Sequence, residues 1–518
     1  MNIRLWGAVT VGAIVAVGWL VLRPGLDRTS APSTSTLRVG IYALPTALGS
    51  PIRALGPPSM YVMTAIFDPL VEVAAGGVPQ PALAEAWHRL DSLRWAFRLR
   101  PGVSFANGEP MNAEAVVTSI ERLLDPATPT VLSRLLGNVA EVRATADLSV
   151  EFTTRTPSVD FPNDLAGIWI VPPKAWAAMG ETEFARRPVG TGPYRAVLWE
   201  RNRLVLEAHP GSWRKATIDR VEVTEVADEA ARMAAFQSGG IDVVIQVSPD
   251  GMDQIAAAGG QTLTIAAGTV YAIALNGTRP GSPFADIRVR QAANYAVNKA
   301  DIAEVLFHRT AAPMGQPAST ITAGYDPDVP AYPYDPARAR ALMADAGFGD
   351  GFDLRLEVIT NAVPADAAMF AAVARDLTAA GIRTEVRAAP LPVFFERFYA
   401  NSFEGLAFQL GFISMPSLDT VKGITDFTCD KPGSTPFMCL PDLQPLIAAA
   451  RAAADPDERR AAMRAINRAA HDQALALFLV EGVDLFAISA AVRAPAPATR
   501  FIHWEDFDLV SSPSRGPS

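Results

Sequence analysis

Two cysteines, Cys429 and Cys439, are the residues whose type and spacing most directly suggest covalent chemistry. They are the only cysteines in the 518-residue sequence, and ten positions separate them. In an exported protein such a pair indicates a disulfide rather than a metal site, and two free thiols are the alternative. Closing so short a loop stabilises the folded chain by about 2–3 kcal/mol in the chain-entropy model.

Motifs that carry catalysis or cofactor binding are missing from the sequence. It contains no G-x-x-x-x-G-K-[ST] phosphate loop, no G-x-G-x-x-G turn and no G-x-S-x-G nucleophile elbow. Its histidines are far apart and none belongs to an H-E-x-x-H pair: His88, His209, His308, His471 and His503. A triad could still assemble from distant residues, so an enzyme is disfavoured without being eliminated. We predict no catalytic residue, no metal ligand and no cofactor.

The elements that position these residues alternate between strand and helix patterns. Apolar residues alternate with polar or small ones at 37–41 and 354–358, which predicts strands. Helices are predicted to begin after the capping residues Asn112, Asp335 and Asp455, the last two of which precede a proline. This alternation indicates the α/β class.

The N-terminal segment predicts export. Residues 5–22 form an uninterrupted apolar stretch of about 27 Å as a helix, close to the bilayer core of about 30 Å. An uncleaved signal-anchor and a cleaved signal peptide therefore both stay open for residues 1–23. The Pro/Ser/Thr-rich residues 24–36 are a predicted linker. Either alternative predicts a periplasmic protein, tethered to the inner membrane by 5–22 if the segment is not cleaved.

Composition excludes several classes of protein. With 49% hydrophobic and 19% charged residues, the chain is too apolar for disorder. A net charge of −9 gives no reason to expect a nucleic-acid partner. At about 150 residues per domain, the length predicts two to four lobes.

Four segments carry a family resemblance. Residues 81–117 contain P-A-L-A-E-A-W, F-R-L-R-P-G-V-S-F and N-G-E-P-M-N-A-E-A-V, and 189–194 read V-G-T-G-P-Y. Residues 288–299 read R-V-R-Q-A-A-N-Y-A-V-N-K, and 334–348 begin Y-D-P and end A-G-F. In this order the chain, from about 37 to 507, resembles the family 5 extracellular solute-binding proteins, the peptide, oligopeptide and nickel-type receptors of ABC importers. Its cysteine pair also resembles a disulfide of some dipeptide-type members.

Within the second of these segments, two glycines flank Thr191. Gly190 and Gly192 predict a tight turn that needs backbone freedom.

The resemblance implies an α/β fold: a two-lobed periplasmic-binding-protein-like clamp (class II, large type) with an additional small domain. Lobe I would combine residues 37–60, 185–270 and 480–518, the additional small domain 61–184, and lobe II 271–479. A solute would select the closed state by contacting both lobes and would then pass to ABC permease subunits in the membrane. We expect a monomer with a small-molecule or peptide ligand and no nucleic acid.

The ligand contacts implied by the resemblance centre on residues 411–419, which read G-F-I-S-M-P-S-L-D. Peptide-binding members commonly hold the ligand's α-amine with the Asp of a G-W-x-x-D stretch. Here Ser414 or Met415 occupies that position, and Asp419 replaces it only if the register slips. A buried ammonium without a carboxylate costs several kcal/mol, so a neutral or amphipathic solute is favoured over an ordinary free peptide. The predicted ligand-binding residues are Tyr42, Asn276, Phe408, Gln409, Phe412, Ser414 and Asp419.

Other interpretations stay open. Most aromatic residues between 394 and 412 fit core packing as well as a cleft wall. A membrane-anchored sensor or scaffold that feeds no permease is the alternative function, and a periplasmic hydrolase on the same fold is a weaker one.

Overall fold

The computed structural model describes residues 35–54, 56–127, 130, 132–359, 365–400, 402–425, 429 and 437–510. The predicted targeting segment 1–23, almost all of the linker 24–36 and the tail 511–518 lie outside the described residues. Residues 35–518 form one compact unit. Among the described residues, no helix has the length and apolar character that a membrane span requires.

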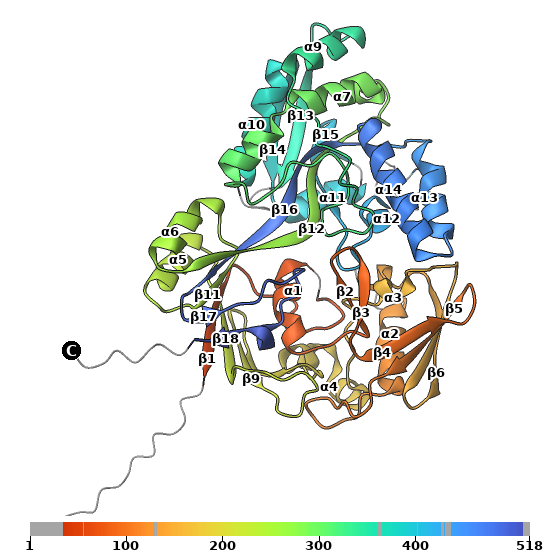
Figure 1. The fold of residues 1–518 in the computed structure, drawn as a ribbon, viewed down its shortest axis with the longest axis vertical. Helices are drawn as coiled ribbons and strands as arrows, with labels where there is room; N and C mark the ends of the chain where they lie inside the picture. The colour runs from red at the N-terminus through yellow and green to blue at the C-terminus, as the bar shows by residue number, and fades with distance from the viewer. Residues whose placement is uncertain are drawn as a thin grey trace, which may run out of the picture. The chain divides into compact units, whose positions relative to one another are not determined.

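A ten-stranded mixed sheet is the largest element of this unit. Its strand order is β14-β13-β15-β12-β16-β11-β1-β10-β9-β8. The strands are β1 (Thr36–Ile41), β8 (Tyr194–Trp199), β9 (Arg203–Ala208), β10 (Arg220–Glu225), β11 (Val243–Ile245), β12 (Gln261–Leu275), β13 (Phe352–Ile359), β14 (Ile382–Ala389), β15 (Ala407–Ile413) and β16 (Leu477–Ile488). The two longest, β12 and β16, pair antiparallel at the centre, so one sheet connects the upper and lower halves of Figure 1.

Smaller sheets cover the lower half. A four-stranded antiparallel sheet has the order β4-β5-β7-β6, and two further pairs are β2-β3 and β17-β18. Their bounds are β2 (Val71–Ala74), β3 (Val78–Pro81), β4 (Ala84–Arg89), β5 (Arg94–Leu99), β6 (Val139–Ala146), β7 (Ser149–Thr154), β17 (Val492–Arg493) and β18 (Asp508–Leu509). The alternation of buried Trp95, Phe97 and Leu99 with exposed arginines makes β5 a strand with one wet face.

Helices begin where the capping residues predict. Asn112, Asp335 and Asp455 each accept a backbone N–H of the first turn of α2, α9 and α14, so these three predictions are confirmed. The α-helices are α1 (Pro57–Val62), α2 (Ala113–Leu124), α3 (Phe161–Asp164), α4 (Pro173–Arg186), α5 (Glu229–Gln237), α6 (Met252–Ala257), α7 (Ile287–Ala296), α8 (Lys299–Asp301), α9 (Pro336–Asp345), α10 (Asp366–Ala379), α11 (Leu391–Ala400), α12 (Thr420–Gly423), α13 (Leu443–Ala452) and α14 (Pro456–Asp472). Short 3-10 turns lie at Met63–Ala65, Leu132–Arg134, Pro249–Gly251, Pro283–Ala285 and Trp504–Asp506, and a π-helical turn at Ile302–Leu306.

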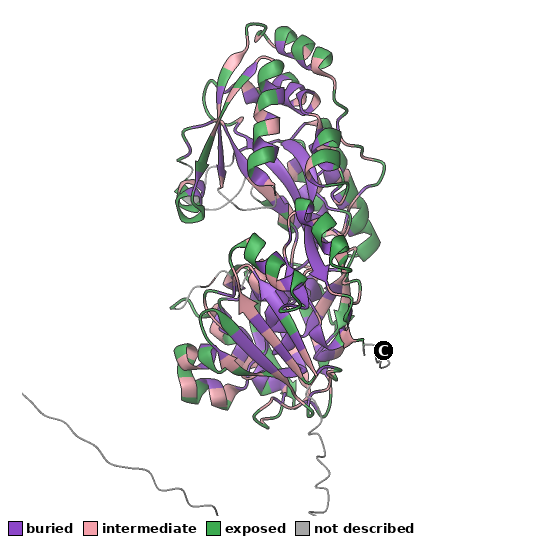
Figure 2. Cartoon of the chain, turned by 90° about the vertical axis from the view of Figure 1, so that its left-hand side faces the viewer, coloured by how far each residue is buried: buried purple, intermediate pink, exposed green. Residues whose placement is uncertain are grey.

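Three main hydrophobic cores divide the unit. The first joins β1 and β10 to the four-stranded sheet and the segment 502–507, and we call the residues around it lobe I. The other two lie on opposite faces of β12, since Tyr271 and Ile273 enter one core and Val270 and Ala272 the other. We call the residues around these two cores lobe II. Figure 2 shows the buried strands in purple between helices with exposed green faces.

Residues 61–184 share the first core with β1, because Val39 and Phe97 belong to the same buried cluster. We keep the name additional domain for 61–184. The boundaries proposed for it and for the two lobes stay predictions.

The glycines of the V-G-T-G-P-Y segment have a different purpose from the one predicted. Neither Gly190 nor Gly192 has a positive φ, so the expected need for backbone freedom is wrong. Instead, a Cβ at Gly190 would overlap the carbonyl oxygen of Ile66, and one at Gly192 would lie 2.5 Å from that of Ala65. Close contact between two backbone segments, rather than turn geometry, therefore requires glycine here.

Candidate ligand-binding site between the lobes

The loop that follows β15 holds the position where a peptide-binding Asp was expected. Ser414 fixes this loop, because its N–H and its hydroxyl both donate to the Gly268 carbonyl at 2.9 Å. Its hydroxyl also lies 2.7 Å from that of Thr322. Gly268 interrupts the β12–β16 ladder with a φ of 64°, and a Cβ there would lie 2.7 Å from Met415. This bulge in β12 therefore makes room for the loop.

The same loop contacts lobe I. A Cβ on Gly167 of the additional domain, which shares the core of lobe I, would lie 3.4 Å from Pro416 and 3.5 Å from Phe501. A cavity of about 10 Å³, room for about one water molecule, is left between them. It is lined by Ala54, Ser59, Met60, Leu132, Gly167, Trp169, Pro416 and Phe501. The loop thus lies at the boundary between the lobes.

A buried ion pair lies where the central strands pass between the lobes. Arg500 donates from Nε and Nη2 to the two carboxylate oxygens of Asp484 at 2.6 and 2.9 Å. The Tyr61 hydroxyl donates to the same carboxylate at 2.7 Å. Tyr271 on β12 and Tyr42, directly after β1, are both near enough to interact with the charges of Arg500 and Asp484.

Burial keeps the phenols of this cluster protonated. It raises the pKa of Tyr271 to about 12, and the pKa values of Tyr42 and Tyr61 also rise well above their usual range. The nearby Asp484 charge acts in the same direction on all three. Tyr42 is partly exposed, whereas Tyr61 and Tyr271 are buried.

The predicted contact residues do not all lie in one place in the structure. Tyr42 lies in the tyrosine cluster and Ser414 in the boundary loop. Asp419 caps α12 by accepting from the Lys422 N–H at 3.1 Å, and it accepts from Arg459 at 2.5 Å. Its carboxylate is therefore engaged within lobe II rather than turned to a solute.

The other predicted residues support the interior of lobe II. Phe408 and Phe412 are buried in the third core, and Phe408 packs against Phe403 at a centroid distance of 4.4 Å. Gln409 accepts the Ile359 N–H at 2.8 Å. Asn276 closes a turn, because its side-chain oxygen accepts hydrogen bonds from the backbone N–H groups of Thr278 and Arg279.

The sequence patterns did not identify four residues of this cluster: Tyr61, Tyr271, Asp484 and Arg500. A signal for Asp484 was present, since it is charged in β16, a strand whose residues are otherwise nearly all apolar and all buried. A carboxylate in such a strand requires a partner. Nothing in the sequence around Arg500 identified it as that partner.

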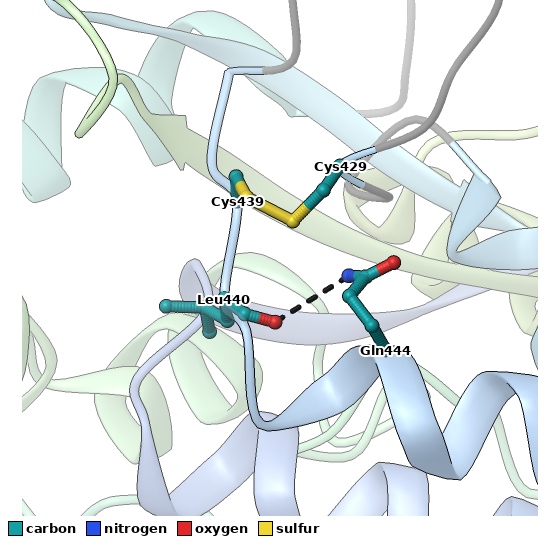
Figure 3. The surroundings of a disulfide bond; sticks show 4 residues. All are labelled: Cys429, Cys439, Leu440 and Gln444. Atoms are coloured by element: carbon teal, nitrogen blue, oxygen red, sulfur yellow. Dashed lines mark hydrogen bonds between the residues drawn. A yellow bond between two sulfur atoms is a disulfide. The ribbon is translucent and has the colours of Figure 1, made fainter.

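A disulfide joins Cys429 and Cys439, which confirms the predicted pairing. Figure 3 shows it just before α13, where the Gln444 side chain donates to the Leu440 carbonyl at 3.4 Å. Within the described ranges, no group of three or more His, Cys, Asp or Glu side chains could hold a metal ion.

A family model described as "Bacterial extracellular solute-binding proteins, family 5 Middle" matches residues 78–419. The chain belongs to family 5 of the bacterial extracellular solute-binding proteins. The resemblance predicted from its motifs is thereby confirmed. Family 5 relatives include a "Glutathione-binding protein GsiB" from Pectobacterium atrosepticum, 32% identical over 273 residues, which are 51% of this chain and 52% of that protein. The chain thus matches about half the length of such curated relatives.

Solved structures of ABC-transporter binding proteins share the fold. CtaP from Listeria monocytogenes aligns with a TM-score of 0.81 and 19% identity, covering 92% of this chain and 99% of its own. DppA from Helicobacter pylori, in complex with the peptide STSA, aligns with a TM-score of 0.75 and 22% identity, covering 92% and 98%. These neighbours confirm the predicted α/β binding-protein fold.

Proposed function

We propose that this family 5 protein captures a small solute between its lobes in the periplasm and delivers it to an ABC permease. Family membership over residues 78–419 carries this proposal. The boundary loop and the tyrosine cluster support it, because they bring residues of both lobes to one place. The proposed mechanism is reversible closure, with no covalent step and no catalytic residue.

The proposed solute is recognised by neutral hydrogen bonds rather than through a free α-ammonium. Neither Ser414 nor Met415, the two candidates for the position of the expected Asp, carries a charge, and the Ser414 hydroxyl donates to the Gly268 carbonyl. The Asp419 carboxylate is engaged by Arg459 and by the N-terminus of α12. An ammonium placed there would lack the counter-charge that offsets its desolvation. An amide-rich, peptide-like solute with a blocked or distant amine fits these constraints.

Calorimetric titration with matched ligands tests both parts of the proposal. We would compare glutathione, a free tetrapeptide and the same tetrapeptide with an acetylated N-terminus, and identify any co-purified solute by mass spectrometry. The account predicts that acetylation leaves the affinity unchanged or raises it. A loss of tenfold or more on acetylation would contradict recognition without an ammonium. If neither these ligands nor any co-purified solute bound, the capture function itself would be contradicted.

A further inference from the structure

The additional domain contacts lobe II through the turn between β2 and β3 and through α3. Gly76 N–H donates to the Ile321 carbonyl at 2.7 Å. The Asn163 side chain donates to the carbonyls of Gly77 at 2.7 Å and Ser417 at 3.3 Å. A Cβ on Gly77 would lie 2.9 Å from the Leu418 carbonyl oxygen. The two surfaces therefore meet in close contact with specific backbone pairing.

Five charged side chains lie in this contact, and we call them the interlobe charge cluster: Asp160, Asp164, Asp419, Lys422 and Arg459. Arg459 Nη2 lies 2.8 Å from Asp160 and 2.5 Å from Asp419. Lys422 Nζ lies 2.9 Å from Asp164. Asp160 and Asp164 belong to the additional domain and the other three to lobe II, so both ion pairs to them join the lobes.

The cluster has one carboxylate more than it has cations. The side chains of Arg459, Asp419 and Asp164 keep exposures of 6%, 4% and 4%, and that of Asp160 keeps 16%. An excess charge among them would be poorly solvated. The carboxylates of Asp160 and Asp419 converge on the same atom, Arg459 Nη2, so two acidic groups share one cation. One bound proton therefore balances the charges of the cluster.

The charges that face Asp160 are those of Asp419, Arg459, Asp164 and Lys422, and Ser158 donates to it at 3.0 Å. Burial first, and the Asp419 charge second, raise the pKa of Asp160 to about 7. Burial likewise raises the pKa of Asp164. Separation of the lobes would return Asp160 to water, where an aspartate has a pKa of about 3.9.

We propose that the interlobe charge cluster is a proton-dependent latch, in which closure of the lobes takes up one proton shared by Asp160 and Asp419. This latch rests on the proposed function insofar as it requires lobes that open and close. Closure takes up the proton between pH about 4 and about 7, so the closing constant rises about tenfold for each unit that the pH falls in this range. Above pH about 7 the closing constant levels off at its lowest value.

Distance measurements on the full chain test the latch without any solute. Spin labels on the exposed positions of Glu141→Cys in the additional domain and Arg451→Cys in α13 would report the separation of the lobes. From pH 8 to pH 5 the ratio of closed to open molecules should rise about 100-fold. An unchanged distance distribution between these pH values would overturn the proposal.

Two variants sharpen this test. Asp160→Asn keeps the shape of the side chain and is neutral like the protonated acid, so its distribution should match the wild-type one at low pH and lose its pH dependence. Asp326→Asn alters a buried carboxylate that pairs with Arg468 at 2.6 Å within lobe II, so it should keep the wild-type pH response. A pH response that persists in Asp160→Asn would also overturn the latch.

Glutathione titrations at pH 5 and pH 8 separate the two proposals. Closure that depends on pH, combined with no solute binding, would preserve the latch and remove the proposed function. Solute binding combined with closure that does not depend on pH would preserve the proposed function and remove the latch.

Discussion

At the scale of single residues, buried charges are held by partners that come from distant parts of the chain. Asp484 lies in a fully buried strand and is held by Arg500 and Tyr61, and Asp419 is held by Arg459. Burial of an unpaired charge costs free energy, so each buried carboxylate indicates that a cation or hydrogen-bond donor lies next to it.

Removal of the cation from the Asp484 pair should destabilise the protein strongly. Arg500→Met leaves Asp484 buried and uncompensated, and we expect the free energy of unfolding to fall by about 3–5 kcal/mol in denaturant titrations. Arg460→Met is the control, since Arg460 pairs at 2.7 Å with Asp457 and both side chains are exposed, so it should change stability by about 0–1 kcal/mol. Equal effects of the two substitutions would contradict a structural role for the Asp484–Arg500 pair.

The contact residues show how far single residues can be interpreted from sequence. Tyr42 and Ser414 lie at the boundary between the lobes, but Phe408 and Phe412 fill a core. An aromatic side chain lowers the free energy equally well in a core or in a cleft wall, so its type alone cannot distinguish the two. The type of Asn276 is equally ambiguous, because an amide oxygen can accept a hydrogen bond from a ligand or from a nearby backbone N–H group. In the structure it accepts from the backbone and closes a local turn.

At the scale of elements, local sequence patterns predicted individual helices and strands but not how the strands pair. The helices after Asn112, Asp335 and Asp455 and the strands at 36–41 and 352–359 follow from caps and alternation. The single ten-stranded sheet did not follow, because pairs such as Val243 with Ile488 join residues that no local pattern relates. Long-range register depends on the packing of the whole chain.

The close approach of Gly190 to the Ile66 backbone predicts how a substitution at this glycine changes stability. In Gly190→Ala the new methyl group would overlap the Ile66 carbonyl, so we expect a loss of at least about 2 kcal/mol in the free energy of unfolding. Gly349→Ala adds a methyl group at ordinary contact distance, 3.7 Å from Ala344, and should change stability by less than about 1 kcal/mol. If denaturant titrations showed Gly190→Ala to be as stable as wild type, close backbone approach would not explain this glycine.

At the scale of the whole molecule, one ten-stranded sheet extends through both lobes and contributes to the cores of each. β12 and β16 supply side chains to both halves, and the loop after β15 reaches Gly167 of the additional domain beside Phe501 of lobe I. The additional domain adds a second contact through the interlobe charge cluster. Binding and closure are therefore expected to be coupled through these two contacts, with the central strands as the connection.

A crystal structure of the protein with its co-purified solute tests this account most directly. The account predicts electron density for a solute between the lobes, in contact with Tyr42 of lobe I and with residues of lobe II near the 414–419 loop. A solute held entirely within one lobe, with the other lobe making no contact to it, would contradict the account.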